Sequence, residues 1–231
     1  PDSSRTQFMI DYLLPQGTRI QQVSEDLRGI EDELLQQDGV TAVSAFIGSG
    51  PPRFYLPVDP EDSHASYGQL IVNTETLADV DRVMAHIYPW TQENRSQALV
   101  RVRKYGVGAF DDWKFEARFS GPAEADPEVL RDIAAQALAI LEASPYTLES
   151  RSDWREKVRK LVPEYNQERA RWAGVTRDDL ASATKRSYDG VPVGQYREGD
   201  DLTPIVVRNP EAERRFAAAE LDVVQVVPSL S

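Results

Sequence analysis

The sequence contains no cysteine, and this absence excludes several kinds of chemistry at once. Without thiols we expect no disulfide, no thiolate nucleophile and no cysteine-ligated zinc. Histidine and methionine are also scarce, with two of each in 231 residues. His64 and His86 lack the clustered or i,i+4 spacing of a zinc site, so we predict no bound metal and expect both to be ordinary histidines.

Long apolar runs and an excess of basic residues are missing too. No run approaches the roughly 20 residues of a membrane-spanning helix, and 38 acidic residues against 26 basic ones give a net charge of -12. A nucleic-acid-binding protein needs a basic face that displaces counterions, so we expect no nucleic-acid partner. The opening residues PDSSRTQF include neither an initiator Met nor a secretion signal, and we therefore expect a part of a longer protein.

Catalytic motifs are likewise missing. There is no G-x-S-x-G elbow, and GSGPPR lacks both the G-K-[ST] ending and the following helix of a phosphate-binding loop. The acidic pairs fall at turns or helix starts, where binding to free backbone amides accounts for them; they are Asp111-Asp112, Asp178-Asp179 and Asp200-Asp201. We therefore predict no catalytic residue, no cofactor and no enzyme activity.

Hydrophobic patterning is the strongest positive signal. Alternation predicts strands at residues 7–14, 40–47, 67–74 and 98–104. Steps of three and four predict two helices, one with a stripe at 20, 23, 27, 30 and 34 that Asp38-Gly39 ends with a left-handed cap, and one with a stripe at 77, 80, 84 and 87 that Thr74 or Thr76 caps. Two β-α-β units of this size predict an α+β, ferredoxin-like split β-α-β sandwich.

A third unit starts in the same way and is left incomplete. We predict strands at residues 113–121 and 155–165 around a helix that begins at Asp126-Pro127. Its apolar stripe is Val129, Ile133, Ala137 and Leu141. Short helices at 166–172 and 175–188 and a hairpin at 191–208, with its turn at 198–201, then follow. These last roughly 60 residues are expected to be an insertion into the third unit.

The segment FIGSGPPRFYLPVDP, residues 46–60, combines flexibility, stiffness and aromatic surface. Gly48 and Gly50 allow a swing, Pro51-Pro52 stiffens the arm, and Phe54 and Tyr55 can line or plug a cleft. The alternative is an ordinary connection whose aromatic side chains pack into the core.

Several motifs resemble one family in order and register over more than 200 residues. They are LPQGT, GSGPPRFYLP, YGQLIVNT, EARFSGP, GVPVGQYREGD and RNPEAER. The chain resembles the periplasmic porter domain of resistance-nodulation-division (RND) efflux permeases of the AcrB/AcrD/AcrF type, in their second large periplasmic loop. The resemblance implies a first porter subdomain at 1–110, a second at 111–172 without its returning segment, and a docking subdomain at 173–231.

The family exports substrates from a proton-driven homotrimer at the periplasmic face of the inner membrane. It works with a periplasmic adaptor and an outer-membrane channel, and its drug-exporting branch carries hydrophobic or amphiphilic small molecules. The resemblance places a glycine-hinged switch loop at Gly48, Gly50, Arg53, Phe54 and Tyr55. Further residues of the substrate cleft are Met9, Asp11, Lys114, Arg151 and Asp153, and docking contacts fall to Gly194, Tyr196 and Arg197.

Two departures qualify this resemblance. The loop has Pro-Pro-Arg where drug exporters have a longer Gly/Phe-rich stretch, which predicts a stiffer gate. Only Met9 is placed for soft-metal coordination, which needs more than one thioether, so organic cargo is favoured over copper or silver. The alternatives are a stand-alone ferredoxin-like regulatory module that binds a ligand, which should have a complete third unit, and an enzyme, which should have a cluster of titratable groups.

Overall fold

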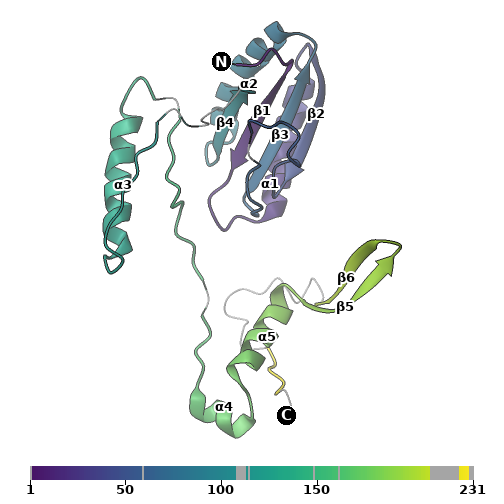
Figure 1. Cartoon of the computed structure of the whole chain (residues 1–231), viewed down its shortest axis with the longest axis vertical. Coiled ribbons are helices and arrows are strands. Elements are labelled where there is room, and N and C mark those ends of the chain that lie inside the picture. The colour runs from purple at the N-terminus through teal and green to yellow at the C-terminus, as the bar shows by residue number, and fades with distance from the viewer. Residues whose placement is uncertain are drawn as a thin grey trace. The chain divides into compact units, whose positions relative to one another are not determined.

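The structure is a computed structural model that describes residues 2–58, 60–107, 113, 115–147, 149–160, 162–208 and 224–228 (Figure 1). The chain divides into two compact units, residues 1–158 and 159–231. The three subdomains that the sequence suggests, with boundaries at 110 and 172, stay a prediction. Among the described residues, no helix has the length and apolar character needed to cross a membrane.

The first unit contains the split β-α-β sandwich that the sequence predicts. Its elements are β1 (Gln7–Leu13), α1 (Ile20–Leu35), β2 (Val40–Ile47), β3 (Tyr67–Thr74), α2 (Leu77–Asn94) and β4 (Leu99–Lys104). The strand order is β2-β3-β1-β4, and every neighbouring pair is antiparallel. β1 and β3 are the central strands, and α1 and α2 contact the sheet, as Figure 1 shows.

The core lies between the sheet and the two helices. β1 alternates strictly, so that Phe8, Ile10 and Tyr12 join the stripes of both helices in one buried cluster. Gly68 of β3 lets the layers approach closely, because a Cβ atom there would lie 2.5 Å from Leu27 Cδ1. Burial of this apolar surface is the main stabilising contribution to the sandwich.

Two details of the helices differ from the prediction: how α1 ends and which residues of α2 are buried. α1 ends at Leu35 with Gln36 as a right-handed C-cap, while Gly39, with φ +77°, forms the turn into β2. Thr76 caps α2 in a capping box with Asp79, as predicted. The buried stripe of α2 is Val80, Val83, Ile87 and Thr91, because Leu77 is exposed at the helix start and the helix runs on to Asn94.

The predicted strands of the third unit do not form. Residues 113 and 115–121 and the described part of 155–165 are not in strands. Alternation alone is insufficient, because the backbone groups of a strand must pair with a neighbouring strand, and neither segment has one among the described residues. Between them, α3 (Pro127–Glu142) begins as predicted at Asp126 and Pro127, but none of its residues is buried.

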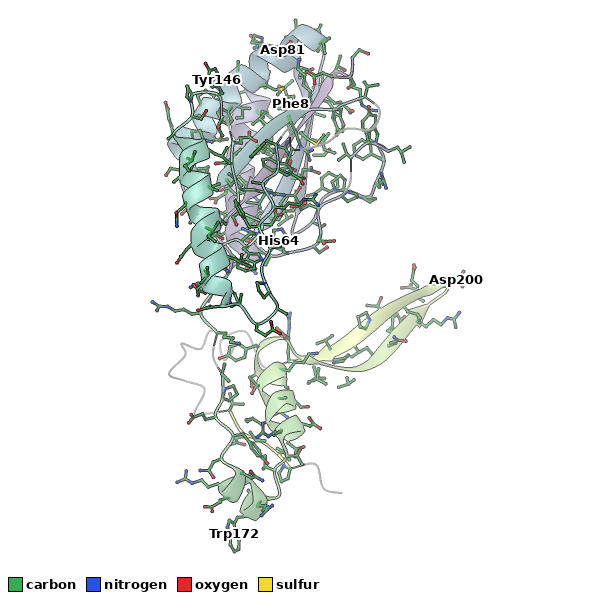
Figure 2. All side chains as sticks on the ribbon, turned by 60° about the vertical axis from the view of Figure 1, so that its left-hand side comes forward. Phe8, His64, Asp81, Tyr146, Trp172 and Asp200 are labelled. Atoms are coloured by element: carbon green, nitrogen blue, oxygen red, sulfur yellow. The ribbon has the colours of Figure 1, made fainter. Side chains whose placement is uncertain are left out.

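The second unit holds α4 (Gln167–Ala173), α5 (Arg177–Tyr188), β5 (Val191–Glu198) and β6 (Asp201–Val207). Asn166 caps α4, and a capping box of Thr176 and Asp179 starts α5. β5 and β6 pair as the predicted hairpin, whose tip Asp200 marks in Figure 2. Both strands are largely exposed, as is Trp172 at the end of α4.

Candidate functional site

The sheet face turned away from the helices, called the outer face below, carries buried polar residues such as Asp11 and Gln69. It is formed by the alternate residues of three strands, which are Met9, Asp11 and Leu13 of β1, Tyr67, Gln69 and Ile71 of β3, and Arg101 and Arg103 of β4. Met9 is 1% exposed and Asp11 is 7% exposed. Burial on the side without helices means that other segments of the chain cover this face.

Asp11 is the centre of a hydrogen-bonded network on the outer face. Its Oδ1 accepts from the Tyr67 hydroxyl at 2.8 Å and from Gln69 Nε2 at 2.7 Å, and its Oδ2 accepts from Arg103 Nε at 2.8 Å. Burial, and next the negative charge of Asp11, raise the pKa of Tyr67, so its hydroxyl stays a donor. The carboxylate is thus neutralised within the protein and holds three strands in register.

The first covering segment is residues 48–58, called the aromatic loop below. Gly48 starts it with φ +80°; its N–H donates to the Tyr67 carbonyl at 2.8 Å, and its own carbonyl accepts from His64 N at 2.9 Å. A Cβ atom at Gly48 would lie 2.8 Å from Ile20 Cδ1, whereas one at Gly50 would meet its nearest neighbour, Gln69 Oε1, at 3.4 Å. Gly48 is therefore a fixed bend, and Gly50 is the position that tolerates a side chain.

The tip of the aromatic loop rests on Tyr105, just after β4. The rings of Phe54 and Tyr55 lie edge-on to Tyr105, with centroids 6.0 and 5.2 Å away, and the Tyr55 hydroxyl donates to the Gly106 carbonyl at 2.6 Å. Arg53 donates to the Leu56 carbonyl and curls the tip. A cavity of about 20 Å³ lies under the loop, lined by Met9 and Gln69 of the sheet, and it has room for about one water molecule.

The second covering segment is residues 149–158, which follow α3. Six residues of this segment, among them Arg151, Asp153 and Arg155, help to line a cavity of about 530 Å³. The other lining residues include Leu13, Leu14, Leu99, Glu61 and His64. Arg155 has φ +24° and donates to the Leu14 carbonyl at 2.5 Å and to Ser66 Oγ at 3.4 Å. Burial, and then the Arg155 charge, lower the pKa of His64. The cavity has the size of a small-molecule site, and its lining mixes apolar side chains with polar and charged ones.

Trp113 lies between two arginines at the edge of the outer face. The guanidinium of Arg101 is 4.2 Å from the ring centroid and that of Arg151 is 4.8 Å away. Arg101 also pairs with Glu149 at 3.2 Å. Burial raises the pKa of the Glu149 carboxyl, and the Arg101 charge opposes this rise.

The structure brings together most of the residues singled out from the sequence. Met9, Asp11, Arg53, Phe54 and Tyr55 share the outer face, and Arg151 and Asp153 border the larger cavity. Lys114 lies outside the described residues. Gly194, Tyr196 and Arg197 belong to β5 in the second unit, where Arg197 Nε donates to the Gly199 carbonyl.

Sequence reasoning missed Arg5, Tyr105, Glu149 and Arg155, which reach the outer face from points far apart in the chain. No local pattern marks them, and residue 155 falls in a segment whose alternation predicted a strand. In the part of the chain that the structure describes, no group of three or more His, Cys, Asp or Glu could hold a metal ion.

Comparisons with known proteins point to one family. The sequence model of the AcrB/AcrD/AcrF family matches residues 1–228. A crystal structure of a heavy metal efflux pump (crystal form II) is similar with a TM-score of 0.70 at 13% identity, over 97% of this chain and 23% of the pump. Crystal form I gives a TM-score of 0.64 at 12% identity, over 92% of this chain and 22% of the pump. This chain thus spans about a quarter of the pumps' length. No curated protein sequence matched.

Proposed function

The chain belongs to the AcrB/AcrD/AcrF family, and from this membership we propose that it is the periplasmic porter portion of a proton-driven efflux permease. In this proposal the parent protein is a homotrimer of the inner membrane that works with a periplasmic adaptor and an outer-membrane channel. The outer face of the sandwich is a wall of the substrate path, and the hairpin of the second unit belongs to the docking region.

The observation that carries the proposal is the packing of the aromatic loop. The loop bends at Gly48, crosses the outer face and ends in Phe54 and Tyr55 against Tyr105, with Met9 beneath. Phe54 is 51% exposed, so a large apolar ring is presented at the edge of the loop rather than packed in the core. A ring held in this way can contact a passing molecule, and it can move away from the outer face without disturbing the core of the sandwich.

We assign the cargo to organic amphiphiles. Export of a soft metal ion calls for two or more thioether or thiolate ligands close together. Met9 borders the loop cavity, whereas Met84 packs against the core on the helical side of the sheet, and the chain has no cysteine. The larger cavity is lined by both apolar and charged side chains, which suits a molecule with a hydrophobic body and a polar end.

Deletion and complementation of the gene for the full-length transporter test this assignment. Cells without the transporter should accumulate a fluorescent amphiphilic dye and recover export when the gene is restored. Their tolerance to silver and copper ions should stay the same. Loss of tolerance to these ions with unchanged dye export would contradict the proposed cargo.

The role of the loop is tested by Gly50→Ala and Phe54→Ala. Both glycines were expected to supply flexibility, but a Cβ atom at Gly48 would meet Ile20, so Gly50→Ala is the cleaner change. We expect Gly50→Ala to reduce export of bulky dyes more than of small ones, and Phe54→Ala to weaken both. Equal export profiles for both variants and the parent would remove the loop from the proposed path.

A further inference from the structure

Three segments that are distant in the sequence meet at the tip of the aromatic loop. They are residues 2–5 ahead of β1, the loop residues Phe54 and Tyr55, and residues 105–106 after β4. Ser3 N donates to the Tyr105 carbonyl at 2.7 Å, and Asp2 forms a β-bridge with Gly106. The Tyr55 hydroxyl donates to the carbonyl of the same Gly106. The loop tip is therefore attached to the segments through which the chain enters and leaves the sandwich.

Arg5 lies at the centre of this meeting point. Its Cζ is 5.0 Å from the centroid of the Tyr55 ring and 5.3 Å from that of Tyr105, so one guanidinium contacts both rings. These distances fall within the roughly 6 Å range of cation–π attraction. Since the two rings are on different segments, the same cation holds one against the other.

The orientation of the guanidinium is fixed by the sheet. Arg5 Nε and Nη2 donate to Gln7 Oε1 at 3.1 and 2.8 Å, and Gln7 Nε2 in turn donates to Asn73 Oδ1 on β3. Among the described residues, no carboxylate forms an ion pair with Arg5. Within the described part of the chain, the guanidinium of Arg5 thus contacts Gln7 and the two aromatic rings.

From these contacts we propose that Arg5 is a positioning residue that holds the aromatic loop closed over the outer face. The Arg5, Tyr55 and Tyr105 side chains form a latch. When the latch is closed, the space that remains between the loop and the sheet is the cavity of about 20 Å³. Releasing the latch frees the loop tip without touching the buried core. This inference rests on the proposed function, because a closed loop restricts export only if the outer face is the substrate path.

A spin label on the loop tests the latch directly. Leu56 is 79% exposed, so Leu56→Cys can carry the label in the full-length transporter after any cysteines outside this chain are changed to serine. We expect Arg5→Met to raise the ratio of mobile to immobile label about three- to tenfold, since two cation–π contacts are lost. Arg28→Met is the matched control, because it removes an exposed arginine from α1 on the helical side.

Two further variants separate a latch from a general loss of structure. Arg5→Lys keeps the positive charge but loses the planar group that contacts two rings, so we expect an intermediate rise in mobility. Tyr55→Phe keeps the ring and removes the hydrogen bond to Gly106, so we expect a smaller rise. Melting temperatures should stay near that of the parent in all four variants, because Arg5 lies outside the core.

Unchanged label mobility in folded Arg5→Met and Arg5→Lys would overturn the latch. Its failure is distinguishable from failure of the proposed function, because mobility is measured on purified protein without transport. A rise in mobility together with unchanged dye export would confirm the latch and contradict the role of the loop in efflux.

Discussion

The sandwich and the segment after it carry similar sequence patterns and form very different structures. α1 has an apolar stripe of which Val23, Leu27, Ile30 and Leu34 are buried, whereas α3 has an equally regular stripe and no buried residue. In α3, Val129 is 55% exposed and Ile133 is 40% exposed. The difference is the presence of a sheet, since an amphipathic helix gains stability only when its apolar face packs against a second layer.

The largest expected effect comes from breaking the ionic network of the sandwich. Asp11→Ala leaves Arg103 partly buried without its carboxylate, and loss of one partner of a buried ion pair costs about 3–5 kcal/mol of unfolding free energy. The matched change after the sandwich is Glu128→Ala, which removes the exposed partner of Lys157 and should cost at most about 1 kcal/mol. Urea denaturation followed by circular dichroism measures both; similar losses would contradict the comparison.

The same substitution in two helices tests how much apolar burial stabilises the sandwich and the segment after it. Ile30→Ala removes a side chain that is 0% exposed in α1 and should cost about 2–5 kcal/mol. Ile133→Ala in α3 should change the unfolding free energy by about 0.5 kcal/mol or less, because that side chain is not packed in a core. If Ile133→Ala lowers the unfolding free energy as much as Ile30→Ala does, then α3 is buried against a second layer and the contrast with α1 is wrong.

The smallest expected effect is a pH dependence from the buried tyrosines. Burial is the main cause that raises the pKa of Tyr12 and of Tyr67, so both stay protonated in the folded protein well above their ordinary pKa of 10.0. Their contribution to stability is complete below pH 10 and is lost as pH rises, by about 1.4 kcal/mol per pH unit for each tyrosine. Both tyrosines lie in strands of the sandwich, so this loss of stability tests the sandwich and not the segment after it.

Tyr67→Phe isolates one of the two. The variant should be less stable than the parent at pH 8, because a hydrogen bond to Asp11 is lost. Between pH 10 and pH 11 the stability difference should narrow by about 1 kcal/mol, because the unfolded tyrosine is already half ionised at pH 10. A constant difference over this interval, measured by chemical denaturation, would mean that Tyr67 ionises equally easily in the folded and unfolded chain.

The same contrast explains which elements of the fold could be predicted from the sequence. Strands 40–47 and 67–74 and an N-terminal cap of the second helix at Thr74 or Thr76 were predicted, because alternation and capping depend on neighbours in the chain. The segments 113–121 and 155–165 alternate as well, yet strand formation depends on a partner strand, which no local pattern reveals. In α2 the predicted positions 80 and 87 are buried and Met84 packs against the core, but Leu77 is exposed at the helix start. The prediction missed Val83 and Thr91, which are also buried.

The candidate site was predictable only in part, for a related reason. Glycine, proline and aromatic residues in one short segment marked the aromatic loop. Arg5 and Tyr105 complete its packing from about 50 residues away on either side, and they form contacts that only the folded sheet creates. Asp11 was placed in the cleft through a family resemblance; its partners Tyr67, Gln69 and Arg103 became apparent from the strand register.

The close approach at Gly68 has a consequence for the loop. Leu27 Cδ1 lies 2.5 Å from the position of a Cβ atom on Gly68. Ile20, about two turns earlier on the same helix, lies with its Cδ1 2.8 Å from the position of a Cβ atom on Gly48. The distance between α1 and the sheet, which Gly68 keeps short, therefore also determines how closely Ile20 approaches the bend at Gly48. A side chain added at position 68 would lift the helix and thereby move Ile20 away from the bend at Gly48.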